Sequence, residues 1–263
     1  MSNTSKYALI TGATSGIGLE LAKLFAKDQY NLVIVGREQA ALDSTSMQLK
    51  NDAGVEVRTI VADLFQKDAA MEIYNEVQGM GIPINVLVND AGQGQFGQFL
   101  DTDLDRELDI IQLNIVAYVS LTKYFLKDMV ARGEGKILNV GSIAGELPGP
   151  YQSVYHGTKA FVNSWTEALR NEVKDRGITV TLLLPGPTET DFFNKAEMQN
   201  SKVTDMSMSD PSKVAQDGFD ALMSGDDKII SGFKNKAMVG AGHVIPDSAA
   251  AEAMKKMQEP KDK

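Results

Sequence analysis

The sequence contains no cysteine among its 263 residues. This absence excludes disulfide bridges, thiolate catalysis and metal sites with cysteine ligands, and we expect no metal centre. A chain without disulfides is typical of a reducing compartment, so we predict a cytoplasmic protein.

Long apolar runs are also missing. The first apolar run, Tyr7–Ile10, stops at Thr11 and Gly12 and is too short for the core of a signal peptide. No run reaches the ~18 apolar residues of a membrane-spanning helix, so we expect a soluble protein without a membrane span. Basic residues are the minority, with 26 against 35 acidic residues and a formal net charge of -9. A nucleic acid would meet net repulsion and is not expected as a partner.

Short β-branched or aliphatic runs alternate along the chain with longer segments of helical periodicity. This alternation is typical of βαβ units and predicts an α/β fold, a Rossmann-type doubly wound parallel sheet of about seven strands with helices on both faces. The expected strands are Tyr7–Thr11, Asn31–Gly36, Val55–Ala62, Asn85–Asn89, Lys136–Gly141, Thr179–Leu184 and Lys228–Ser231. The expected helices are Gly16–Lys27, Glu38–Lys50, Lys67–Met80, Leu104–Arg132, Gln152–Arg176 and Pro211–Met223.

No Pro/Gly/Ser-rich linker divides the chain, so residues 1–263 are expected to form one domain. The segment 185–210 lacks clear periodicity, and loops of that length in compact domains are often functional, which makes it the expected substrate loop. The role of the tail 232–263 is open. Within it, Ser248–Glu259 has the pattern of an amphipathic helix that could close a pocket, pack on a partner subunit or touch a membrane surface.

A glycine-rich turn joins the first expected strand to the first expected helix. It comprises Thr11, Gly12, Thr14, Ser15, Gly16, Ile17 and Gly18. Glycines allow a tight turn and the close approach of a pyrophosphate, while the helix N-terminus offers unpaired N–H groups and a positive dipole. A tight turn without a ligand is the alternative interpretation, but the position on the first strand of a βαβ series favours a dinucleotide site.

The end of the second strand indicates the cofactor. Proteins that prefer NAD(H) usually have an acidic residue there, whereas this chain has Gly36 followed by Arg37. A guanidinium can pair with a 2′-phosphate, so we predict NADP(H), with NAD(H) possible. Alternatively, Arg37 is only a solvated arginine at the end of a strand.

Three residues form a candidate catalytic group. Tyr155 and Lys159 are four residues apart in an expected helix and therefore project from the same face. A nearby ammonium stabilises a phenolate and lowers the tyrosine pKa. Ser142 follows a strand at the sheet edge where open α/β sheets bind ligands, so its hydroxyl could hold the same substrate oxygen. A Tyr/Lys pair on a helix is otherwise usually surface decoration, and Ser142 is what favours catalysis.

From Tyr7 to about Thr190 the sequence closely resembles the short-chain dehydrogenases/reductases, in the branch with subunits of about this length. The resemblance is carried by the glycine turn, Asp63, Asn89-Asp90-Ala91-Gly92, Asn114, Ser142, Tyr155-x-x-x-Lys159 and Pro185-Gly186. It implies that the single domain binds the dinucleotide and performs catalysis, and that the protein is a homodimer or homotetramer through its longest helices.

The resemblance also implies roles for individual residues. Tyr155 would be the general acid or base, Ser142 would orient the substrate oxygen, and Lys159 would lower the Tyr155 pKa and bind the nicotinamide ribose. Asn114 would kink its helix and hold a water that joins Lys159 to solvent. The remaining cofactor contacts would be Asp63 and Leu64 at the adenine, Asn89, Ala91 and Gly92 at the adenosine ribose, and Pro185, Gly186, Thr188 and Thr190 at the nicotinamide.

Each of these has a plainer alternative: Asp63 as a helix cap, Asn114 as a satisfied buried amide, and Pro185-Gly186 as a turn. Two positions depart from the family pattern. Asp90 stands where the family usually has asparagine, and an ionised carboxylate cannot donate a hydrogen bond. Ser15 stands where a basic residue often supports NADP, so the NADP(H) prediction depends on Arg37.

The expected reaction is hydride transfer between NADP(H) and a small-molecule carbonyl or alcohol. Segments 93–100, 145–152 and 185–210 should select the substrate, and the Phe and Met residues of the last suggest an apolar one. The same residues could instead pack that loop against the body. A dinucleotide-binding regulator or sensor without turnover is the alternative function, and a nucleotide-sugar epimerase or dehydratase would need a larger substrate domain than this chain supplies.

Overall fold

The computed structural model describes residues 6–261, in which seven parallel strands form one sheet with the order β3-β2-β1-β4-β5-β6-β7. The strands are β1 (Tyr7–Thr11), β2 (Asn31–Gly36), β3 (Val57–Val61), β4 (Ile84–Asn89), β5 (Gly135–Val140), β6 (Ile178–Leu184) and β7 (Lys228–Ile230). The strand order reverses between β1 and β4, which is the signature of a doubly wound sheet. The predicted fold class is confirmed.

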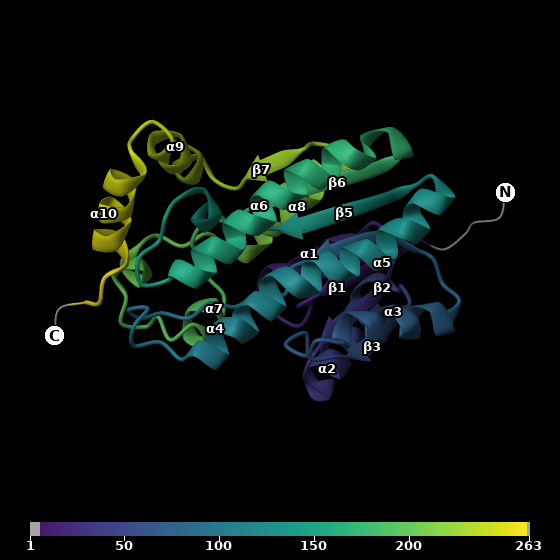
Figure 1. Ribbon diagram of the computed structural model, residues 1–263. Helices are drawn as coiled ribbons and strands as arrows, with labels where there is room; N and C mark the ends of the chain where they lie inside the picture. The colour runs from purple at the N-terminus through teal and green to yellow at the C-terminus, as the bar shows by residue number, and fades with distance from the viewer. Residues whose placement is uncertain (1–5, 262–263) are drawn as a thin grey trace.

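Helices cover both faces of the sheet. They are α1 (Gly16–Lys27), α2 (Gln39–Ala53), α3 (Ala69–Met80), α4 (Leu104–Ile111), α5 (Ala117–Arg132), α6 (Ser153–Val173), α7 (Phe192–Lys195), α8 (Pro211–Ser224), α9 (Phe233–Gly242) and α10 (Asp247–Gln258). Buried residues of α1, α2 and α8 pack on one face, and those of α3, α5 and α6 pack on the other (Figure 1). Because successive strand side chains point to opposite faces, both faces must be apolar: in β1, Ile10 faces the first group and Leu9 the second.

The expected helix Leu104–Arg132 is instead three pieces. Between α4 and α5 lies a π-helical turn, η1 (Gln112–Val116), with Asn114 at its centre. The predicted irregularity at Asn114 is therefore present as a π turn, the form in which an extra residue is commonly inserted into a helix near a functional site.

Segment 185–210 and the tail from residue 232, which were only partly predictable from the sequence, contain short helices. In the expected substrate loop 185–210, α7 is followed by a 3-10 turn, η4 (Lys202–Asp205), and Thr188 bridges to Ser209. The tail forms α9 and α10, and α10 lies at the same end of the molecule as α4 and α7 (Figure 1). In the described part of the chain, no helix combines the length and apolar character needed to span a bilayer.

Candidate active site

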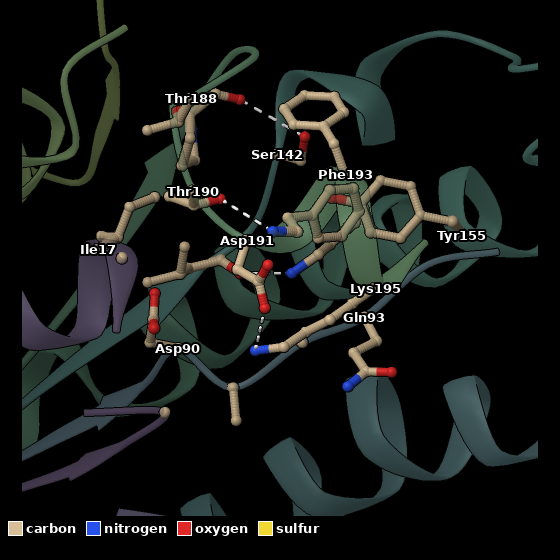
Figure 2. Close-up of a pocket in the computed structure, with 18 of the residues that line it drawn as sticks. Ile17, Asp90, Gln93, Ser142, Tyr155, Thr188, Thr190, Asp191, Phe193 and Lys195 are labelled. Carbon is tan, nitrogen blue, oxygen red and sulfur yellow. Dashed lines mark hydrogen bonds and ion pairs between the residues drawn. The ribbon is translucent and has the colours of Figure 1, made fainter. Parts of the chain in front are cut away.

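A cavity of about 440 Å³ lies along the carboxyl ends of the central strands. Its wall includes Gly12 after β1, Asp90 after β4, Gly141 after β5 and Pro185 after β6. Figure 2 shows Ile17 and Asp90 at one side of this cavity and Tyr155 at the other, with Thr190 and Asp191 between them. The position is the one at which open α/β sheets bind ligands.

The glycine turn forms the floor of the cavity beside α1. Gly12 and Gly16 have φ values of 73° and 56°, a left-handed conformation that side chains with a Cβ rarely adopt. Ser15 is the N-cap of α1 but its side chain makes no capping hydrogen bond. The Ser15 side chain thus leaves the first N–H groups of the helix uncapped, and those other than the Gly18 N–H suit an anion such as a pyrophosphate together with the helix dipole.

Asp90 packs directly against this turn. Its carboxylate accepts a hydrogen bond from the Gly18 N–H, and a Cβ on Gly18 would lie 2.5 Å from Asp90 Oδ2. Thr11 Oγ1 accepts from the backbone N–H groups of Asp90 and Ala91 at 3.1 and 3.2 Å. The contact with Gly18 needs an acceptor and not a donor, so a carboxylate oxygen can make it as an amide oxygen would.

Two ionisable groups face each other across this part of the cavity. Burial raises the pKa of Asp90 to about 7, and the charge of Lys159 opposes that rise. Burial lowers the pKa of Lys159 to about 8, and the charge of Asp90 opposes that fall. Lys159 Nζ also donates to the Val140 carbonyl at 2.9 Å. Both groups therefore titrate near neutral pH, as groups at functional sites often do.

Tyr155 and Ser142 meet at the substrate end of the cavity. Ser142 is the N-cap of a 3-10 turn, η2 (Ile143–Glu146), with Oγ accepting from Ala144 N at 3.0 Å. Burial raises the pKa of Tyr155 to about 12, and a hydrogen bond with Ser142 is the influence that lowers it. The Tyr155 ring lies over Gly94, where a Cβ would be 3.3 Å from the ring, and 5.1 Å from the centroid of Phe192.

Asn114 supports the wall of the cavity through hydrogen bonds to Gln93 and Thr158. Its Oδ1 accepts from Gln93 N at 3.1 Å, and its Nδ2 donates to Gln93 O at 2.8 Å and to Thr158 Oγ1 at 3.0 Å. A Cβ on Gly92 would lie 3.4 Å from Asn114 Oδ1 and 3.5 Å from Lys159 Nζ. Asn114 thus ties the loop after β4 to the helix that carries Lys159.

The far end of the cavity is built by the ends of β2 and β3. The Arg37 guanidinium lies 5.3 Å from the centroid of Phe65, and Asp63 Oδ1 accepts from Phe65 N at 3.2 Å. Leu64 and Glu38 complete this end. Asp63 therefore shapes a turn and does not cap α3, whose N-cap is Asp68.

The sequence matches the family described as short chain dehydrogenase over residues 6–201. The chain belongs to this family. A ketoacyl reductase, HetN, from Nostoc sp. is 34% identical over 183 residues, which are 70% of this chain and 63% of that protein. A human very-long-chain 3-oxoacyl-CoA reductase is 36% identical over 186 residues, which are 68% of this chain and 58% of that protein. The chain thus spans less than two thirds of the length of these curated relatives.

Solved structures resemble the chain over more of its length. A short-chain dehydrogenase from Sphingobium yanoikuyae in complex with NADPH has a TM-score of 0.81 and 28% identity, and the match covers 94% of this chain and 99% of that one. A bulky-bulky ketone specific alcohol dehydrogenase from Comamonas testosteroni has a TM-score of 0.78 and 27% identity, with 95% and 99% covered. The family to which the chain belongs binds nicotinamide dinucleotides.

In this short-chain dehydrogenase, most residues predicted for the site line the one cavity. They are Gly12, Thr14, Ser15, Gly16, Ile17, Arg37, Asp63, Leu64, Ala91, Gly92, Ser142, Tyr155, Lys159, Pro185, Gly186, Thr188 and Thr190. Thr11, Gly18, Asn89 and Asn114 lie behind the described wall of the cavity and support it.

Asn89 differs most from its expected role at the adenosine ribose. Its buried Nδ2 donates to Thr122 Oγ1 at 2.9 Å and to Asn139 Oδ1 at 2.8 Å. The side chain therefore joins β4 to α5 and β5. An asparagine at the end of a strand has the same sequence signal whether it faces a ligand or a neighbouring strand, so the sequence could not distinguish these two positions.

The three segments expected to select the substrate are joined by hydrogen bonds. Phe96 N donates to Ala196 O at 3.0 Å, Gly97 N donates to Tyr151 O at 2.9 Å, and Gln152 Nε2 donates to Met198 Sδ at 3.0 Å. Phe192, Phe193, Met198, Val203 and Met206 both pack together and line the cavity, so the two interpretations of the apolar loop are compatible.

Some residues of the wall were not predicted. His156 lines it from α6, and Gln258 lines it from α10 beside Met254 and Met257, whereas Gln93 and Gln152 belong to segments that were expected to select the substrate. A polar residue in a helix of otherwise ordinary pattern gives no signal that it will reach a pocket built by distant segments. For the tail, only the amphipathic pattern of Ser248–Glu259 was a signal, and α10 confirms that helix.

Proposed function

We propose that this short-chain dehydrogenase transfers a hydride between NADP(H) and an apolar carbonyl or alcohol substrate, with Tyr155, Ser142 and Lys159 as its catalytic residues. The observation that carries the proposal is that Ser142, Tyr155 and Lys159 line the same cavity as the glycine turn. A proton donor and a dinucleotide site in the same cavity are what a carbonyl reductase requires.

The residues present fit a dinucleotide. The left-handed glycines and the free N-terminus of α1 suit its pyrophosphate, Asp63 and Leu64 suit its adenine, and Thr188 and Thr190 suit its nicotinamide end. Arg37 supports NADP(H), since its guanidinium can pair with a 2′-phosphate. Glu38 lines the same end and would oppose that phosphate, so the preference depends on which side chain lies closer to it.

The protein side chains would handle the proton. At neutral pH a tyrosine with a pKa of about 12 holds its proton, which suits reduction of a carbonyl. Ser142 would donate to the carbonyl oxygen and fix its position beside the Tyr155 hydroxyl. Bound in the cavity, the reduced nicotinamide would supply the hydride to the carbonyl carbon. The proton would pass from Tyr155 Oη to the oxygen, and Lys159 would stabilise the phenolate that remains.

The substrate end supports an apolar carbonyl compound. The apolar residues of its wall are Leu147, Phe192, Phe193, Met198, Val203, Met206, Met238, Met254 and Met257, and Gln152, His156 and Gln258 also line the cavity. The resemblance to a dehydrogenase specific for bulky ketones and to reductases of 3-oxoacyl compounds agrees with this character.

The proposal is tested by following NADPH and NADH oxidation with a panel of carbonyl compounds for the wild type, Tyr155→Phe and Ser142→Ala. We expect reduction of apolar ketones with NADPH, a loss of kcat of about a hundredfold or more in Tyr155→Phe, and unchanged NADPH affinity. Binding of NADPH without turnover of any carbonyl would instead favour a sensor, and equal activity of wild type and Tyr155→Phe would exclude the assigned acid.

A further inference from the structure

Asn163 is a buried residue of the helix that carries Tyr155 and Lys159. In α6 these three residues follow one another at intervals of four, so their side chains project from successive turns on one side of the helix. Asn163 is 5% exposed, and among the described residues it does not line the cavity of the candidate active site. Any influence of Asn163 on the reaction must therefore pass through the residues that it contacts.

The Asn163 amide holds both ends of the turn that begins at Ser142. Its Nδ2 donates to the Ser142 carbonyl at 3.0 Å and to Glu146 Oε1 at 2.8 Å, and these two residues are the N-cap and the last residue of η2. A carbonyl and an ionised carboxylate can only accept, so the NH₂ group must face them, and both of its hydrogens are used. The amide oxygen, Oδ1, has no partner within residues 6–261. In this part of the chain, the Asn163 side chain thus makes its hydrogen bonds by donating to this one turn.

Two glycines leave the space that this amide occupies. A Cβ on Gly145 would lie 2.6 Å from Asn163 Nδ2, and a Cβ on Gly141 would collide with Asn163 Oδ1. Gly141 directly precedes Ser142, and Gly145 N donates to the Ser142 carbonyl at 3.1 Å. The amide therefore fits closely against the backbone on both sides of the serine, and the Ser142 carbonyl accepts from two donors.

The bond from Asn163 joins two separate elements, since Ser142 follows β5 whereas Tyr155 belongs to α6. Ser142 Oγ accepts from Ala144 N of the same turn, so a shift of the turn would also move the hydroxyl. We propose that Asn163 is a positioning residue that holds Ser142 in place relative to Tyr155. The inference rests on the proposed function, in which both hydroxyls bind the substrate oxygen. Such support matters because a misplacement of about 1 Å can lower a rate about a hundredfold.

The test is a double-mutant cycle of Asn163→Asp and Ser142→Ala, assayed with NADPH and a series of straight-chain methyl ketones. Asn163→Asp keeps the size of the side chain but replaces the donor by an acceptor that faces two other acceptors. We expect kcat to fall about tenfold or more, whereas KM and the Kd of NADPH should change less than about threefold, since Ser142 acts on the reacting oxygen. In the Ser142→Ala background the same change should cost less than about twofold in kcat, because the hydroxyl that Asn163 positions is then absent.

Asn171→Asp makes the same chemical change at an exposed position of α6 and should alter none of these constants by more than about twofold. If Asn163→Asp does not fold, as judged by NADPH binding and cooperative unfolding, Asn163→Ala takes its place in the cycle, because it removes the donor without adding a charge beside Glu146.

The inference is overturned if kcat is unchanged in the folded Asn163 variant. It is also overturned if the losses from the two substitutions multiply in the double variant, which is the result expected of a residue that supports only the fold. If the wild type reduces no ketone, or if Ser142→Ala is as active as the wild type, the proposed function fails and the inference fails with it.

Discussion

The carboxylate of Asp90 accepts a hydrogen bond from the backbone N–H of Gly18, which ties the end of β4 to the first turn of α1. This bond holds the glycine turn in place, and it places a carboxylate whose pKa is raised to about 7 beside a lysine whose pKa is lowered to about 8. The stability of the protein should therefore depend on pH in a way that a single substitution can isolate.

The first prediction concerns Asp90→Asn, which keeps an acceptor for Gly18 but removes the charge. The Asp90 pKa is raised from 3.8 to about 7, so the folded state retains a proton that the unfolded state has released, and stability falls as pH rises through that range. The Lys159 pKa is lowered from 10.5 to about 8, so stability rises again between those values. In Asp90→Asn, stability should therefore not fall as pH rises from 3.8 to about 7.

Urea unfolding measured at intervals from about pH 5 to 8 checks this. The free energy of unfolding of Asp90→Asn relative to wild type should increase over this range by at most about 3 kcal/mol, since about two units of the pKa shift lie within it and each corresponds to about 1.4 kcal/mol. Parallel curves for the two proteins would show that Asp90 has an ordinary pKa in the folded state.

The second prediction concerns cofactor preference. Arg37→Ala removes the guanidinium that lies over Phe65 at the adenine end of the cavity. We expect the Kd of NADPH to rise about tenfold or more and that of NADH to change little, because only NADPH carries a 2′-phosphate to pair with arginine. Fluorescence titration measures both. Arg58→Ala, which removes an exposed arginine paired with Glu56, is the control and should affect neither. Equal weakening of both cofactors would contradict the assignment.

The third prediction concerns the π turn at Asn114. Asn114→Ala removes three buried hydrogen bonds to Gln93 and Thr158 and leaves their partners unsatisfied. We expect a loss of about 2–4 kcal/mol in the free energy of unfolding, because unpaired buried groups cost more than the bonds themselves contribute. Asn194→Ala, which removes an exposed side-chain bond to Asp191, should cost less than about 0.5 kcal/mol. Denaturant unfolding of both variants decides whether Asn114 is structural.

The fourth prediction concerns acid and the C-terminal helix. Burial lowers the pKa of His156 below 6.5, so stability is lost as pH falls below that value, when the unfolded or detached form takes up a proton that the packed ring resists. Protonated Nε2 could also no longer accept from Gln258. Amide hydrogen exchange in α10, corrected for its intrinsic pH dependence, should therefore be faster at about pH 5.5 than at 7.5.

His156→Phe should remove this dependence on pH, whereas His243→Gln should retain it, because the side chain of His243 is 54% exposed and pairs with Glu146. Exchange in α10 that responds equally in all three proteins would place the acid-sensitive group elsewhere.

The fold was predictable because its signals are local. The β1–α1 turn, the alternation of strands and helices and the spacing of Tyr155 and Lys159 each depend on neighbours in the sequence, and the family match over residues 6–201 and the seven-stranded sheet agree with them. The boundaries were less accurate: α2 begins at Gln39 and ends at Ala53, and β3 is shorter than expected. Strand ends are set by pairing with β2, which the sequence of β3 alone does not contain.

The site was predictable where local patterns face the cavity, namely the turns after the strands and the pair Tyr155 and Lys159 on α6. Asn89 bonds across to α5 and β5, and Gln258 reaches His156 over 102 positions of sequence. Both depend on how distant segments pack, for which a single sequence has no periodic signal. From the sequence, only the neighbouring charge of Lys159 was available, and it predicted a lowered pKa of Tyr155. The pKa also depends on burial, which raises it to about 12 and which the sequence does not show.

The hydrogen bonds that join the loops around the cavity limit how this protein can be redesigned. Segment 185–210 is bonded to segment 93–97 through Phe96, and residues 200–202 run beside residues 259–261 through Lys202 N to Glu259 O and Lys261 N to Asn200 O. Transplanting segment 185–210 alone from a relative would therefore leave backbone groups in these two other segments without their partners. A change of selectivity by grafting would have to move these segments as one unit, whereas substitutions within the existing frame leave the bonds intact.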